Sequence, residues 1–250
     1  RDSAITYGEA AGKHADADFI INTTPCGMFP NPEGLPIDPA AFPKLEGVLD
    51  AIYNPLRSRL VLKAKQLGIP AQGGLYMLVA QAVRAVEHFL DTTLPADATN
   101  KVYEKLMTQK ETIVLSGMPG SGKTTVGEAL EQLTGREAID LDREIVRRAG
   151  RSIPEIFASD GEASFRELER QVTAEIGAMS GKLILTGGGV VKDPRNYAPL
   201  HQNGRIYHLM RDLSVLPTDG RPISQSTDLT VLWREREPLY TAFRDAVIDN

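Results

Sequence analysis

The residues best suited to chemistry form one run, Gly117-Met118-Pro119-Gly120-Ser121-Gly122-Lys123-Thr124. This spacing, G-x-x-x-x-G-K-[ST], is typical of a phosphate-binding loop. Glycines let the backbone aim its N–H groups at phosphate oxygens, Lys123 is placed to reach the β- and γ-phosphates, and the Thr124 hydroxyl can bind Mg²⁺. The run predicts a nucleoside triphosphate site formed by Gly117, Pro119, Gly120, Ser121, Gly122, Lys123, Thr124 and Thr125.

The elements around this run are those that such a site requires. Residues 112–116 (TIVLS) read as a short buried strand, and residues 126–133 (VGEALEQL) have helical spacing. A helix that starts just after the loop adds the partial positive charge of its N-terminus. A chance match to the pattern would not be expected to have a strand directly before it and a helix directly after it.

Two carboxylates, Asp140 and Asp142, end the next expected strand, residues 138–142. Alternation along a strand would put both side chains on one side, and the carboxyl edge of a parallel sheet opens to the ligand crevice. The pair could equally cap the helix that begins at Asp142.

Further candidates follow along the chain. Arg166 and Glu169 lie three residues apart on an expected helix, residues 162–179, where an ordinary surface ion pair is the alternative.

A strand ending at Leu185 runs into Gly187, Gly188 and Gly189, which suit close approach of backbone to a ligand. Residues 216–229 are polar and irregular and are a candidate lid.

Arg236 belongs to an expected helix, residues 231–244, that precedes a final strand at 246–249. Its neighbours Arg234, Glu235 and Glu237 are charged as well, which usually marks a solvated face.

Strands and helices also alternate in the first part of the chain, which favours a parallel sheet. We expect strands at 19–23, 47–53 and 69–71 and helices at 56–67 and 75–90. Residues 95–110 are expected to be a linker between two domains, 1–94 and 111–250.

Composition bounds the possible functions. The 250 residues are 42% hydrophobic and 24% charged, as in globular proteins, and the formal charge of −5 offers no basic excess for nucleic acid or an anionic membrane. One cysteine, Cys26, excludes an internal disulfide, and no apolar run approaches the length of a membrane span. We therefore expect a cytoplasmic enzyme with a small-molecule substrate; the oligomeric state stays open.

Residues 112–250 resemble shikimate kinases through several blocks in order: the phosphate-binding loop, D-x-D, S-I-x-x-I-F, G-E-x-x-F-R-x-x-E, G-G-G, the R-P of the lid and R-x-P-L-Y. The resemblance implies transfer of the ATP γ-phosphate to the 3-hydroxyl of shikimate. It implies that Arg166 and Arg236 clamp the substrate carboxylate, with Gly187, Gly188 and Gly189 along the ring. Asp142 would hold the hydroxyls and accept a proton, Asp140 with Thr124 would hold Mg²⁺, and Arg221 would close over the phosphates.

Residues 1–94 resemble the C-terminal part of shikimate dehydrogenases. The blocks that carry this resemblance are N-x-T-P-x-G-M at 22–28, D-x-x-Y-N-P-L at 50–56 and G-G-L-x-M-L-V-x-Q-A at 73–82. It implies that Tyr53 and Gln81 face shikimate and that Gly74 and Met77 lie near the nicotinamide of NADP. Gln81 also shares a helix face with Arg84 and His88, which fits a plain polar stripe.

The family's glycine-rich dinucleotide turn and its Lys–Asp pair have no match here, so dehydrogenase activity is expected only with an upstream region. The predicted fold is α/β: a P-loop kinase domain like the nucleoside monophosphate kinases, preceded by a partial Rossmann-like domain. The predicted function is shikimate kinase fused to part of a shikimate dehydrogenase. The alternative is another small-molecule P-loop kinase with a non-catalytic N-terminal docking module.

Overall fold

A computed structural model describes residues 4–213 and 229–250, and the chain divides into two compact units between Gln109 and Lys110. The first unit thus includes most of the expected linker, whose residues Ala98–Lys110 form helix α4. In the described part of the chain, no helix is both long enough and apolar enough to cross a membrane.

The first unit holds a three-stranded parallel sheet in the order β1-β2-β3. Its elements are α1 (Tyr7–Lys13), β1 (Phe19–Asn22), η1 (Pro39–Ala41), β2 (Gly47–Asp50), α2 (Arg59–Gln66), β3 (Ala71–Gln72) and α3 (Leu75–Leu90). The predicted helix at 75–90 is confirmed at both ends, whereas the second strand ends at Asp50. It ends there because Asp50 turns its carboxylate back onto the chain and accepts the backbone N–H of Ile52 at 3.0 Å.

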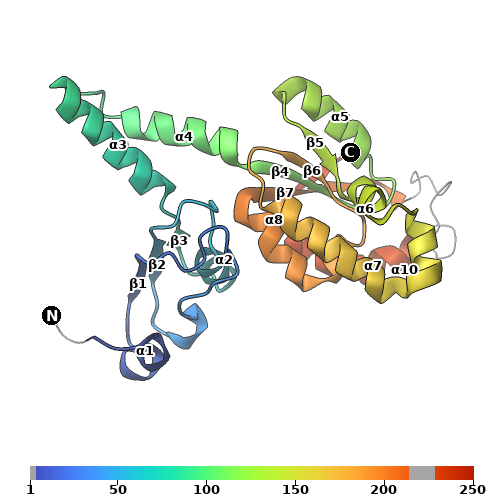
Figure 1. Cartoon of the computed structure of the whole chain (residues 1–250), viewed down its shortest axis with the longest axis horizontal. Helices are drawn as coiled ribbons and strands as arrows, with labels where there is room; N and C mark the ends of the chain where they lie inside the picture. Colours follow the sequence, from blue (N-terminus) through green and yellow to red (C-terminus); the bar gives the residue numbers. More distant parts are fainter. Residues whose placement is uncertain (1–3, 214–228) are drawn as a thin grey trace. The chain divides into compact units, whose positions relative to one another are not determined.

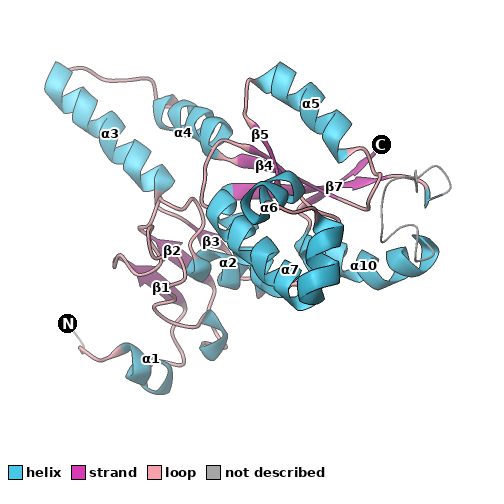
Figure 2. Cartoon of the chain, turned by 45° about the vertical axis from the view of Figure 1, so that its right-hand side comes forward, coloured by secondary structure: helices cyan, strands magenta, loops and turns pink. Residues whose placement is uncertain are grey.

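The second unit holds a five-stranded parallel sheet in the order β5-β6-β4-β7-β8. Figure 2 draws its strands in magenta and labels β5, β4 and β7. Its strands are β4 (Thr112–Ser116), β5 (Ala138–Asp140), β6 (Leu183–Leu185), β7 (Gly204–Met210) and β8 (Ala246–Asp249). Its helices are α5 (Lys123–Thr134), α6 (Leu141–Ala149), α7 (Ile153–Gly177), α8 (Tyr197–Asn203) and α10 (Leu229–Phe243), with 3-10 turns η2 (Val190–Lys192) and η3 (Pro194–Asn196). The predicted parallel α/β fold is confirmed.

Alternate residues of the central strand β4 face two cores. Leu115 packs with Leu183, Leu185 and Leu209 under Val126 and Leu130 of α5. Val114 faces the larger cluster, which includes residues of α6, α7, α8 and α10 (Figure 1). Helices therefore cover both faces of the sheet, and the carboxyl ends of its strands share one edge, where a ligand crevice is expected.

In the first unit, the predicted helix at 56–67 is Arg59–Gln66 and the predicted strand at 69–71 is Ala71–Gln72. In the second unit, two predicted elements differ most from the structure. The strand at 138–142 ends at Asp140, because the Asp140 carboxylate accepts the backbone N–H groups of Asp142 and Arg143 and so caps α6. The helix at 162–179 starts earlier, at Ile153, and is interrupted at Gly161 by a non-helical backbone (φ 82°, ψ 170°) that glycine adopts easily.

Candidate active site

The phosphate-binding loop joins β4 to α5 at the carboxyl edge of the sheet. Gly117, Gly120 and Gly122 have positive φ, which explains why these positions are glycine. Lys123 starts α5, and its ammonium donates to the carbonyls of Gly117 (2.9 Å) and Met118 (3.0 Å), so it lies over the loop. The loop, the lysine and the helix N-terminus form the predicted arrangement for a polyphosphate.

A cleft of about 1010 Å³ opens beside this loop. Of the residues predicted for the kinase site, it is lined by Pro119, Gly120, Gly122, Lys123, Thr124, Thr125, Asp140, Asp142, Arg166, Gly187, Gly188, Gly189 and Arg236. Gly117 and Ser121 belong to the loop but do not line the cleft. Arg221 and most of the candidate lid, residues 216–229, lie outside the described residues.

Asp142 lies in the first turn of α6, deep in the cleft. Alternation along a strand is not what places it beside Asp140, since Asp140 is the N-cap and Asp142 already belongs to the helix. Burial raises the pKa of the Asp142 carboxyl, and the Asp140 carboxylate raises it further, while Lys123 and Arg166 oppose the shift. A carboxylate with a raised pKa beside bound phosphate can accept a proton from a hydroxyl.

The three glycines lie very close to neighbouring side chains, two of which are charged. A β-carbon on Gly187 would lie 2.5 Å from Oδ1 of Asp142, and one on Gly189 would lie 2.7 Å from Nη1 of Arg166. A β-carbon on Gly188 would meet the ring of Pro119 at 2.9 Å. A side chain at these positions would therefore displace Asp142, Arg166 or Pro119, although none of the three glycines has a positive φ.

The surface-pair alternative for Arg166 and Glu169 is not what the structure contains. Nη1 of Arg166 donates to Oε2 of Glu169 at 2.7 Å, and Glu169 is only 2% exposed. Burial raises the pKa of the Glu169 carboxyl, while Arg166 lowers it. The guanidinium is also held by Glu162 at 3.1 Å, so two carboxylates orient it toward the cleft.

Arg236 is likewise not on a solvated face. It is 2% exposed, whereas its neighbours Arg234 and Glu235 are exposed. Nη1 of Arg236 donates to the carbonyl of Gly188 at 2.9 Å, and its buried Nε has no acceptor among the described residues. A buried cation with a free donor suits an incoming anion.

Motif spacing missed several lining residues, among them Arg211, which follows β7, and Ala158, which belongs to the helical turn before Gly161. Phe157 ends the S-I-x-x-I-F block, but that block gave it no role in the site. No motif quoted above includes Arg211 or Ala158. They enter the cleft only because the sheet edge and the bent α7 bring them there.

Residues 119–250 match the family model for shikimate kinase. The chain belongs to the shikimate kinase family. A shikimate kinase from Nitrosomonas europaea is 39% identical over 147 residues, which cover 55% of this chain and 70% of that protein. The structure of shikimate kinase from Acinetobacter baumannii in complex with shikimate is 32% identical, with a TM-score of 0.52, and covers 58% of this chain and 87% of that one.

For the first unit, a chorismate mutase/shikimate 5-dehydrogenase fusion protein from Clostridium acetobutylicum is 34% identical, covering 40% of this chain and 36% of that one, with a TM-score of 0.38. The residues predicted to face shikimate and NADP do not gather in one described pocket. Gly74 is buried against Ala51, whereas Tyr53 and Met77 are 44% and 51% exposed and Gln81 is exposed on α3.

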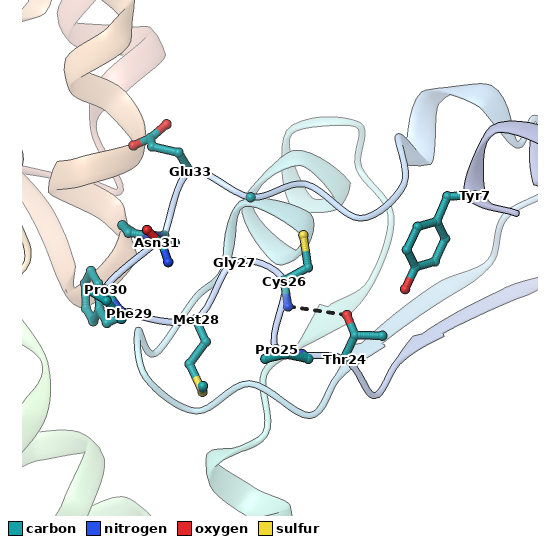
Figure 3. Close-up of a pocket in the computed structure, with 12 residues that line it drawn as sticks. Tyr7, Thr24, Pro25, Cys26, Gly27, Met28, Phe29, Pro30, Asn31 and Glu33 are labelled. Carbon is teal, nitrogen blue, oxygen red and sulfur yellow. Dashed lines mark hydrogen bonds between the residues drawn. The ribbon is translucent and has the colours of Figure 1, made fainter.

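One pocket in the first unit lies elsewhere. A pocket of about 620 Å³ is formed by the loop after β1 and by Tyr7 of α1. In Figure 3, Tyr7 lies on the side of Thr24 and Cys26, and Met28 and Phe29 lie at the other end of the loop. The loop is anchored to the sheet, since Asn22 donates to Asp50 at 3.0 Å and accepts the N–H of Thr24 at 3.1 Å. Cys26 is half-buried in this loop, and its N–H donates to Oγ1 of Thr24.

His208, buried beneath the kinase cleft, should make stability depend on pH. Burial lowers its pKa to about 4, from an ordinary value of 6.5. Between these values the unfolded chain binds a proton that the folded chain does not, so stability should fall as pH drops from 6.5 to 4. The loss should be about 2–3 kcal/mol.

Urea unfolding at several pH values would measure this loss in the wild type and in His208→Gln. The raised pKa values of Asp142 and Glu169 act in the opposite direction in both proteins, so the difference between the two isolates the histidine. Equal pH slopes would contradict the prediction.

Proposed function

We propose that residues 111–250 transfer the γ-phosphate of ATP to the 3-hydroxyl of shikimate. The observation that carries the proposal is one cleft in which a phosphate-binding loop, a buried carboxylate and two oriented arginines meet. Shikimate has one carboxylate and three hydroxyls, and the planar forks of Arg166 and Arg236 suit the carboxylate. Asp142 lies against Gly187 in the cleft and is proposed to hold the hydroxyls.

In this proposal, the loop and Lys123 bind the β- and γ-phosphates, and Lys123 neutralises charge on the group in transfer. Asp142 Oδ accepts the proton of the attacking 3-hydroxyl, whose oxygen forms the new bond to phosphorus as the bond to the ADP oxygen breaks. Arg221 is proposed to contact the phosphates, as the family resemblance implies.

The residues at the loop also fit a Mg²⁺ ion. The Thr124 hydroxyl and the Asp140 carboxylate line the same cleft and are hard oxygen donors. Among the described residues no cluster of three or more His, Cys, Asp or Glu forms an all-protein metal cage, and Mg²⁺ usually takes few protein ligands beside phosphate and water. Bound there, Mg²⁺ would neutralise phosphate charge, with Thr124 and Asp140 holding it.

Coupled ADP release with an acceptor panel tests the function. Turnover of MgATP should require shikimate and should be absent with gluconate or a nucleoside monophosphate. These acceptors represent the alternative small-molecule kinases, which do not need two oriented arginines for a ring carboxylate. Turnover with either of them and not with shikimate would overturn the proposal.

For the first unit, we propose a dehydrogenase-like piece whose complete form would use NADP. The three sequence blocks support it, since each lies at or after the carboxyl end of a parallel strand, β1, β2 or β3, where such folds bind ligands. The rival, a docking module, predicts that deletion of residues 1–94 changes the oligomeric state. Analytical ultracentrifugation of the deletion variant would separate the two.

A further inference from the structure

Tyr240 lies one helical turn after Arg236 on α10 and is completely buried. Its hydroxyl donates to the carbonyl of Gly188 at 2.6 Å. The same carbonyl accepts from Nη1 of Arg236 at 2.9 Å. Two donors from one helix therefore converge on one backbone oxygen of the three-glycine segment.

The packing around Tyr240 leaves its hydroxyl little freedom. The ring packs on the imidazole of His208 at 4.4 Å between ring centres and near the indole of Trp233 at 6.4 Å. The sulfur of Met118, in the phosphate-binding loop, lies 4.0 Å from the hydroxyl. Burial raises the pKa of Tyr240 to about 12, so the hydroxyl keeps its proton and remains a donor.

We propose that Tyr240 is a positioning residue for the carboxylate end of the substrate, acting through Gly188 and Arg236. Because the Tyr240 hydroxyl holds it, the Gly188 carbonyl is a fixed acceptor for Nη1 of Arg236. This hydrogen bond orients the guanidinium, so that its other N–H donors point toward an anion in the cleft. The proposal rests on the function proposed above and adds to it a residue that does not line the cleft itself.

This arrangement predicts a selective kinetic effect. Without the hydroxyl, the Gly188 carbonyl still accepts from Arg236, so no buried acceptor loses its last partner and the fold should persist. The arginine should nevertheless be less well placed, because its acceptor is held by one contact fewer. The KM for shikimate should rise about 3- to 10-fold, corresponding to the loss of a single hydrogen bond, with kcat and the KM for ATP within about 2-fold of wild type.

The test compares Tyr240→Phe with Tyr207→Phe, which makes the same chemical change on β7 outside the cleft. Shikimate and ATP are each varied in the ADP-release assay, and circular dichroism checks the fold. A raised KM for shikimate in Tyr240→Phe alone supports the proposal. Equal KM values in the wild type and Tyr240→Phe, or equal increases for both substrates, would overturn it. A wild type with no shikimate-dependent turnover would instead overturn the proposed function.

Two further variants separate positioning from general packing. A cycle of Tyr240→Phe with Arg236→Lys should be non-additive in kcat/KM for shikimate, because both changes act on one guanidinium. Additive effects would contradict action through Arg236.

Genetically encoded 4-aminophenylalanine at position 240 restores an N–H donor and should keep the KM for shikimate near wild type even if the phenylalanine variant folds poorly. If the KM for shikimate were as high as in Tyr240→Phe, which has no donor at this position, the role of the hydroxyl would be refuted.

Discussion

Asp142→Asn is expected to lower kcat for shikimate phosphorylation by about 10²- to 10⁴-fold, the usual contribution of a general base. The amide keeps the shape of the side chain and its fit against Gly187, but it cannot accept the proton of the attacking hydroxyl. The KM for ATP should change little, since the phosphate-binding loop is untouched. Steady-state ADP release at saturating shikimate measures the effect.

Glu144→Gln is the matched control, because it makes the same acid-to-amide change on the same helix. The Glu144 carboxylate bonds Arg147 and Arg148 and does not line the cleft. This variant should keep kcat within about 2-fold, with any cost confined to stability. If both variants retained full turnover, Asp142 would not be the proton acceptor.

Arg236→Ala is expected to raise the KM for shikimate strongly, by about 30-fold or more, because removal of one partner of a buried charge pair costs about 2–5 kcal/mol. The reason is burial: Arg236 is 2% exposed, so its loss would leave the substrate carboxylate without its charged partner. Calorimetric titration with shikimate measures the loss directly and does not depend on turnover.

Arg234→Ala removes the same side chain two residues away on α10, where it is exposed. It should leave shikimate affinity unchanged, since exposed ion pairs and charges contribute little. Equal losses of affinity in the two variants would mean that net charge, rather than the placement of Arg236, attracts the substrate.

Local patterns were sufficient for part of the site. The phosphate-binding loop is recognisable because its function depends on backbone conformation over eight consecutive residues, and glycine spacing records that conformation. Helix boundaries were less predictable. The start of α6 depends on one carboxylate, Asp140, which turns back to cap the helix and ends the strand two residues early.

Burial could not be read from the chain. Arg236 is one of several adjacent charged residues and Arg166 is three residues from Glu169, and each pattern commonly occurs on a solvated helix face. Both arginines are enclosed because α7 and α10 pack against the turn of three glycines that follows β6. Gly187 touches Asp142 and Gly189 touches Arg166. These contacts likewise depend on which strands lie side by side in the sheet.

The sequence by itself thus determined the phosphate-binding loop, the alternation of strands and helices and the kinase family, since each depends on residues close together in the chain or on motifs in order. Only the tertiary structure decided which charges are buried, which carbonyl Arg236 and Tyr240 share, and that Asp142 meets the glycines. The physical reason is that strand order β5-β6-β4-β7-β8 brings together side chains separated by up to about a hundred residues, and burial then sets their charge and orientation.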